Sequence, residues 1–243
     1  MAKKQEYKPL SHADLFEKHY KRYLKETKGW SNWRITLPLF SKRWAWWCLV
    51  LEKKALPDIE YPKINFITDL PEQAEPFKMI QGCVNQFSDV YFVDFLDWVL
   101  FNFGDGEFRG GLPSRIEKKH IEYWKVNFDL KLLFDNPGDW FGQYYQVKEI
   151  SKKEAERDGL FLTPNHVTQM TAKMIINKND LLSSVNDPCV GSGRFLLSAS
   201  NDSINLSGQD KNPNMAKICK INGWLYMPSL VMPCPDLFKE EQA

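Results

Sequence analysis

A glycine-rich turn between two apolar segments constrains this chain more than any other feature of its sequence. The run Asp187-Pro-Cys-Val-Gly-Ser-Gly-Arg-Phe195 follows a short apolar segment and leads into Leu196–Ala199. This order predicts a strand, a tight turn and a helix, in which the glycines let the backbone pass close to a ligand. The N–H groups at the start of the expected helix are then available to an anion.

An acidic residue follows this turn after a second apolar segment. The segment Leu206-Ser-Gly-Gln-Asp210 predicts a strand that ends in a carboxylate. A glycine-rich turn after one strand and a carboxylate at the end of the next is how Rossmann-like folds bind a cofactor that contains ribose. The sequence therefore predicts a cofactor site between the two segments.

The turn resembles the S-adenosylmethionine motif of N6-adenine DNA methyltransferases, which typically reads Asp-Pro-Cys-x-Gly-Ser-Gly-x-Phe. Three further segments are similar to this family in order and spacing. They are Gly159-Leu-Phe161-Leu-Thr163-Pro164, the run from Gly208 through Asp210 to Tyr226, and Asn136-Pro-Gly-Asp-Trp140, which resembles a segment of type I restriction–modification methylase subunits. The resemblance covers roughly residues 134–238.

The resemblance implies S-adenosylmethionine as cofactor and a set of residues that bind it. Asp210 would bind the ribose, Gly191 and Gly193 would admit the methionine, and Asp236 would contact the adenine. Arg194 stands where the family usually has Gly, so its side chain is expected either to clash with the cofactor carboxylate or to pair with it. The implied cofactor-binding residues are Phe161, Thr163, Pro164, Asp187, Pro188, Cys189, Gly191, Ser192, Gly193, Phe195, Asp210 and Asp236.

The chain departs from the family at the catalytic motif. The family catalyses with Asn-Pro-Pro-Tyr or Asn-Pro-Pro-Phe (or Asp-Pro-Pro-Tyr), but the sequence contains no Pro-Pro dipeptide. After Asp210 we expect one helix, over 212–227, and one strand, over 230–233, so the chain is expected to be truncated before that motif. The catalytic residues are therefore unknown, and a second polypeptide is expected to supply them for methyl transfer.

The patterns predict an α/β C-terminal part, a partial Rossmann-like methyltransferase domain over 134–243, preceded by a mainly helical region over 1–133. Three strands are expected in the order 3-2-1, with the free edge of the first covered by the N-terminal region, a second copy or another protein. Apolar spacing predicts helices over 11–28, 41–54, 77–87, 90–101 and 114–134, a short helix from Ser151, a helix starting at Thr163-Pro164, and a proline-rich loop over 55–76 with a short strand at 64–67.

Composition excludes several classes of protein. No apolar run approaches the roughly 20 residues that span a bilayer, and the N-terminus lacks an apolar signal core. The five cysteines are scattered without a Cys-x-x-Cys pair, which favours reduced thiols in the cytoplasm and no zinc site. The four histidines show no metal-ligand spacing.

The charges divide the N-terminal part into two blocks. Residues 1–54 hold 13 Lys and Arg against 5 Asp and Glu, whereas residues 55–107 hold 2 against 10. The basic block is rich in tryptophan, which leaves two interpretations open: an aromatic core with solvated lysines, favoured by the shared helical face of Trp44 and Trp47, or a surface that stacks on bases and binds phosphates. The residues concerned are Trp30, Trp33, Arg34, Lys42, Arg43, Trp44, Trp46 and Trp47.

Two functions follow. The first is an N6-adenine DNA methyltransferase homologue that binds S-adenosylmethionine and methylates DNA adenine only if a partner completes it. The second is a non-catalytic protein of the same fold that binds DNA or a restriction–modification complex. A compact gene of a phage or mobile element suits either.

Overall fold

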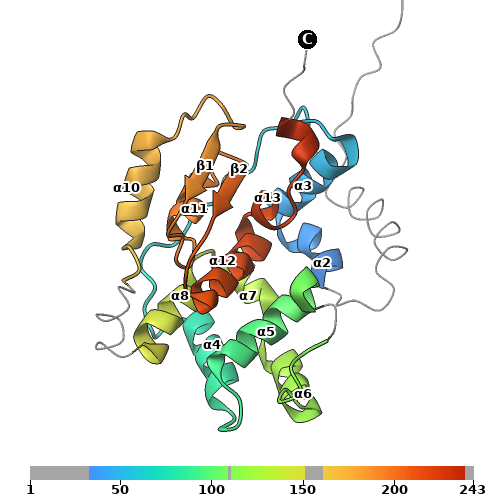
Figure 1. Cartoon of the computed structure of the whole chain (residues 1–243), viewed down its shortest axis with the longest axis vertical. Helices are drawn as coiled ribbons and strands as arrows, with labels where there is room; N and C mark the ends of the chain where they lie inside the picture. The colour runs from blue at the N-terminus through green and yellow to red at the C-terminus, as the bar shows by residue number, and fades with distance from the viewer. Residues whose placement is uncertain (1–32, 109–110, 151–160, 239–243) are drawn as a thin grey trace, which may run out of the picture.

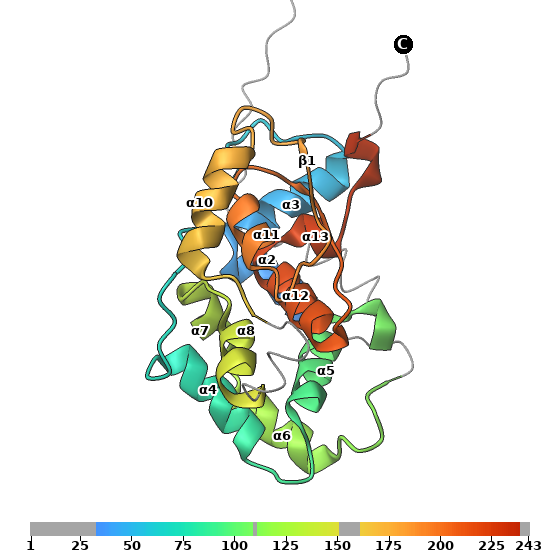
Figure 2. The same cartoon turned by 60° about the vertical axis from the view of Figure 1, so that its left-hand side comes forward.

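The computed structural model describes residues 33–108, 111–150 and 161–238, so the helices expected over 11–28 and from Ser151 lie outside it. The described part is mostly helical with one small parallel sheet (Figures 1 and 2). The first elements are α2 (Trp33–Phe40), α3 (Lys42–Lys53), α4 (Glu75–Asn85), α5 (Phe92–Phe103), the 3-10 turn η1 (Gly106–Phe108), α6 (Lys118–Asn127), α7 (Leu130–Asp135), α8 (Trp140–Tyr144) and the π-helical turn η2 (Tyr145–Glu149). They are followed by α10 (Asn165–Ile175), β1 (Ser184–Asp187), α11 (Arg194–Ala199), β2 (Asn205–Gly208), α12 (Pro213–Tyr226), α13 (Pro228–Val231) and the 3-10 turn η3 (Pro235–Phe238).

The sheet consists of β1 and β2, which pair in parallel with Val185 opposite Leu206. These two side chains are buried, whereas Ser184 and Asn186 are exposed, so the sheet has one apolar and one polar face. Helix α11 packs against β1, α13 packs beside β2, and α10 lies against α11 on the far side from α13 (Figure 1). Because the two strands are parallel, their carboxyl ends lie at the same end of the sheet.

The third strand expected over 230–233 was wrong. This segment begins in helix α13, in which Pro228 occupies the first helical position and accepts a hydrogen bond from the N–H of Met232 at 2.9 Å. Proline suits the first turn of a helix, and a short apolar run does not distinguish a strand from a helical turn. The expected order 3-2-1 was therefore also wrong, and no strand in the described part of the chain pairs with the second edge of β1.

Two other expectations were wrong in detail. The helix expected over 114–134 is interrupted at Phe128, which has an extended backbone, because Asp129 caps a new helix by accepting the N–H of Lys131 at 2.8 Å. The segment 64–67 is not a strand. Its Ile64 instead exchanges two hydrogen bonds with the side chain of Asn201, at 2.8 and 2.9 Å.

The helices expected over 41–54, 77–87, 90–101 and 212–227, and the helix starting at Thr163-Pro164, are confirmed as α3, α4, α5, α12 and α10. Their apolar faces join one hydrophobic core, which includes residues from Leu37 to Cys234. The division at 133 and 134 stays a prediction. Among the described helices, none is long and apolar enough to cross a membrane.

The tryptophan-rich helix α3 belongs to the core, so the aromatic-core interpretation is confirmed for it. Trp44, Trp46 and Trp47 are each at most 4% exposed, and each indole N–H donates to a backbone carbonyl. The acceptor of Trp44 is Trp224 of α12, on which its ring also stacks at 5.6 Å between centroids. These rings are therefore not available to stack on bases. Trp30 lies outside the described residues.

Arg43 fixes the same helix to the C-terminal part through a buried guanidinium. It donates to the carbonyls of Pro62 and Tyr226 and to the side chains of Ser200 and Asn201, at 2.6–3.0 Å. Burial lowers the pKa of the Arg43 guanidinium, because the charged form loses its contact with water. The guanidinium in turn provides hydrogen-bond donors to these four acceptors.

Replacing Arg43 by Ala is expected to destabilise the protein by about 3 kcal/mol or more, since it leaves buried acceptors without donors and a cavity behind. The measurement is urea unfolding followed by tryptophan fluorescence. Lys42→Ala, one residue earlier on the exposed side of α3, is the matched control and should change stability by less than about 0.5 kcal/mol. Equal effects of the two changes would contradict a structural role for Arg43.

Candidate cofactor-binding site

The predicted strand, turn and helix around the glycine-rich run are confirmed as β1, a tight turn and α11. Asp187 ends the strand, and its carboxylate accepts the N–H of Cys189 at 3.0 Å. Gly191 and Gly193 have φ of 54° and 91°, a left-handed conformation that residues other than glycine rarely adopt. A Cβ on Gly191 would also lie 3.2 Å from Leu162, so the turn depends on glycine for two reasons.

Asp210 lies two residues beyond the end of β2 and is tied to the turn. One carboxylate oxygen accepts the N–H of Gly191 at 2.8 Å, and the other accepts the N–H of Asn212 at 2.8 Å. These bonds fix the carboxylate at the carboxyl ends of the two strands. Because a carboxylate oxygen has two lone pairs, each oxygen can still accept a bond from a ligand.

A cavity of about 480 Å³ opens beside this carboxylate. Several separate sequence segments line it, and six of the residues predicted for the cofactor site are among them: Phe161, Thr163, Pro188, Cys189, Gly191 and Asp210. The prediction missed the other lining residues, which are Gln146, Ile150, Leu162, Lys211 and Met215. Most of these residues lie next to the sequence segments that resemble the family, so their position beside those segments could have indicated them.

The other predicted residues do not line this cavity. Pro164 precedes α10 as its N-terminal cap residue, and Gly193 holds the same position for α11. Ser192 is fully buried, and Phe195 is half-buried in α11. Asp187, Ser192, Gly193 and Phe195 thus shape the turn from within.

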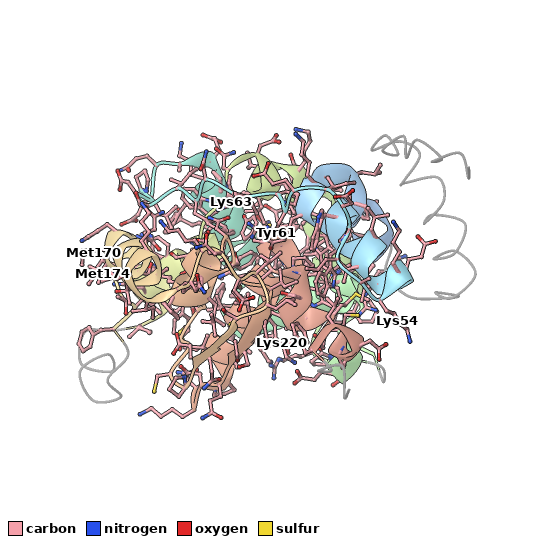
Figure 3. All side chains as sticks on the ribbon, turned by 90° about the horizontal axis from the view of Figure 1, so that it is seen from above. Lys54, Tyr61, Lys63, Met170, Met174 and Lys220 are labelled. Carbon is pink, nitrogen blue, oxygen red and sulfur yellow. The ribbon has the colours of Figure 1, made fainter. Side chains whose placement is uncertain are left out.

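Asp236 lies apart from the cavity. It sits in η3, where its carboxylate pairs with Lys54 at 2.8 Å, at the end of α3 (Figure 3). The missing third strand explains this, because the helical turn α13 directs the chain toward α3. The hydrogen bond to Asp236 raises the pKa of Lys54. Because the Lys54 side chain is 66% exposed, this ion pair adds little stability.

A second hollow of about 270 Å³ lies between β2, α12 and α13, where the third strand was expected. Asp210 lines both cavities. Leu230 and Val231 contribute apolar lining to this second hollow, and Gln209 and Lys220 contribute polar lining.

The buried carboxylate of Asp139 connects several of the elements that form the site. It is 1% exposed and accepts four hydrogen bonds, two on each oxygen. The donors are the N–H of Gly142 at 3.0 Å, the hydroxyl of Ser192 at 2.5 Å, Nε of Arg194 at 2.7 Å and Nδ2 of Asn222 at 2.8 Å. One side chain thus connects α8, the glycine-rich turn, α11 and α12.

Arg194 pairs with this carboxylate. The sequence left open a clash or an ion pair between Arg194 and a cofactor carboxylate, but the carboxylate that the structure gives it is Asp139. The guanidinium is 6% exposed and also donates to the carbonyl of Thr163 at 3.2 Å and to Gln143 at 3.1 Å. It does not line the cavity.

The cysteines differ in exposure. Cys189 is exposed at the cavity, whereas Cys48, Cys83, Cys219 and Cys234 are buried. Burial raises the pKa of Cys83 to about 12, and burial with the nearby charges of Asp139, Asp187 and Asp210 does the same for Cys219. In the described part of the chain, no three His, Cys, Asp or Glu side chains are grouped to hold a metal ion.

Replacing Asp139 by Asn is expected to cost about 3–5 kcal/mol of stability, because it leaves the buried Arg194 without its counter-ion. Urea unfolding measures the change. The control is Asp135→Asn, since Asp135 is 55% exposed and pairs with Lys131 on the surface, where such pairs contribute about 0–1 kcal/mol. An Asp139 variant as stable as the Asp135 variant would contradict the structural role.

Comparison with known proteins identifies the segment that contains this site. Residues 136–227 match the family model described as N-6 DNA Methylase. The chain is also 29% identical over 118 residues to the "Type II restriction enzyme and methyltransferase RM.BcgI" of Heyndrickxia coagulans, a match that covers 45% of this chain and spans 17% of that relative's length. No solved structure matches the chain. The family match and this similarity confirm the resemblance to N6-adenine DNA methyltransferases over residues 136–227.

Proposed function

We propose that the larger cavity binds S-adenosylmethionine and that residues 134–243 form part of a Rossmann-like cofactor fold. The convergence of the segments 161–163, 188–191 and 210–211 on one cavity carries this proposal. Ligands of open parallel sheets bind at the carboxyl ends of the strands, where this cavity lies. Its volume is within the range of roughly 300–1,000 Å³ that is usual for small-molecule sites.

Each part of the cofactor then has a place. The Asp210 carboxylate, already oriented by two backbone N–H groups, accepts hydrogen bonds from the ribose hydroxyls. The methionine part lies against the turn at Gly191, under Phe161 and Thr163. We place the adenine toward the second hollow, where Leu230 and Val231 offer apolar contact. Asp236 is left out of this set, because it borders neither cavity and pairs with Lys54.

The proposed reaction is methyl transfer to the exocyclic amine of adenine in DNA. It needs a polar group and a carbonyl that hold the target amine beside the sulfonium, and an aromatic ring for the flipped base. The 243 residues contain no Pro-Pro dipeptide and hence no Asn-Pro-Pro motif to supply them. These groups must come from outside these residues, so the chain's own contribution to the reaction is the cofactor site.

We propose that the complementary groups approach along the second edge of β1. That edge is unpaired in the described part of the chain. Helix α10, which packs against α11, exposes Met170, Met174 and Ile175 by 57%, 75% and 65%, and Figure 3 shows Met170 and Met174 at the surface. A strand added to β1 in parallel would end beside Pro188 and Cys189, at the cavity. A separate polypeptide that carries the catalytic motif is the candidate for supplying it, because a second copy of these 243 residues would bring no Asn-Pro-Pro motif.

Calorimetric titration with S-adenosylmethionine tests the proposed cofactor site. We expect micromolar binding, weakened about 10- to 100-fold by Asp210→Ala, because a hydrogen bond to a charged group contributes about 1.5–3 kcal/mol. Asp58→Asn, at an exposed position outside the site, is the control. If the folded wild-type chain shows no binding, the alternative function gains support: a non-catalytic protein that binds DNA or a restriction–modification complex.

Thiol chemistry provides an independent test. A disulfide reagent at pH 8 is expected to modify one thiol rapidly, because Cys189 is exposed, whereas the raised pKa values of Cys83 and Cys219, about 12, keep these thiols protonated. Saturating S-adenosylmethionine should slow the rapid reaction severalfold, and Cys189→Ser should abolish it. An unchanged rate in the presence of bound cofactor would place the cofactor elsewhere.

A further inference from the structure

The segment Phe161–Pro164, called the cover segment below, lies across the glycine-rich turn with few attachments. Phe161, Thr163 and Pro164 are exposed, and Phe161 is 68% accessible. Among the described residues, the backbone from Phe161 to Thr163 makes one hydrogen bond, from Arg194 to the carbonyl of Thr163. A second contact is apolar, because Leu162 packs over Gly191.

Arg194 is well suited to fix a carbonyl in one place. Its planar guanidinium is buried, and each of its three nitrogens has a separate partner: Asp139, Thr163 and Gln143. The ion pair with Asp139 sets the plane of the guanidinium, which leaves the nitrogen facing Thr163 little freedom to move. A lysine has one charged nitrogen and cannot reproduce this fork of donors.

We propose that Arg194 is a positioning residue that holds the cover segment over the cavity. It acts through the carbonyl of Thr163 and, with Leu162 on Gly191, sets where Phe161 and Thr163 meet a ligand. Its consequence for cofactor binding rests on the proposed function, whereas its effect on the cover segment does not. Arg194 thus pairs its charge with the buried Asp139 and donates to the carbonyl of Thr163 in the cover segment.

The test is Arg194→Lys, which keeps a cation for Asp139 but removes the bond to Thr163. Chymotrypsin at low concentration under native conditions probes the cover segment, since the bond after Phe161 is exposed and mass spectrometry identifies the cut. We expect cleavage there to rise about five- to tenfold, the effect of losing one hydrogen bond, and the Kd for S-adenosylmethionine to rise by a similar factor.

Two controls separate positioning from general destabilisation. Arg115→Lys changes another arginine paired with a buried carboxylate, that of Asp94, away from the cover segment, and should leave the cleavage after Phe161 unchanged. Urea unfolding of each variant reports the global stability. Gln143→Ala removes a different partner of Arg194 and should affect the cut after Phe161 less than Arg194→Lys does.

Unchanged cleavage after Phe161 in Arg194→Lys would overturn the proposal. A uniform rise of cleavage at all sites, matching a loss of global stability, would also overturn it, because Arg194 would then be only structural. If the wild-type chain binds no S-adenosylmethionine, the proposed function fails, but the cleavage comparison still decides the role of Arg194.

Discussion

The buried carboxylate of Asp139 is the interaction on which the site depends. A carboxylate removed from water is costly unless its lone pairs find donors, and here four donors from three segments of the chain meet it. Gly142 cannot be replaced by a larger residue without moving this carboxylate, because a Cβ on Gly142 would lie 2.1 Å from it. The bonds to this one charge therefore fix the arrangement of α8, the glycine-rich turn and α12. The two-stranded sheet is too small to fix that arrangement alone.

The N-terminal helices contribute in the same manner, through polar groups that must find partners inside the core. Arg43 and the indole N–H groups of Trp44 and Trp47 bind carbonyls of the C-terminal part. Arg34 donates to the carbonyls of Phe103 and Gly104 while lying over the ring of Trp224. Such bonds are directional, whereas apolar contacts are not. They fix the orientation of α2 and α3 against α12, and they account for basic and aromatic residues that from sequence alone were also compatible with a nucleic-acid surface.

What the sequence predicted well was local, and what it missed depends on distant contacts. The turn from Asp187 to Phe195 and most helices follow from glycine positions, capping and apolar spacing within a few residues. The partner of Arg194 lies 55 residues earlier in the chain, so no local pattern reveals that the two charges neutralise each other. The strand expected over 230–233 was wrong because four apolar residues suit a helical turn equally well, and Asp236 follows this helical turn into an ion pair with Lys54.

The two faces of the sheet limit how the fold can be completed. Parallel sheets in α/β proteins are usually covered on both faces and have apolar strands throughout. Here one face carries Val185 and Leu206 against the helices, whereas the other carries Ser184, Asn186 and Ser207, with the Ser207 hydroxyl bonded to Asn186 at 2.9 Å. A second helical layer would have to desolvate these polar groups without offering partners. An added strand would instead satisfy the unpaired backbone groups of β1, which makes the strand edge, and not the polar face, the favourable place for a complementary segment.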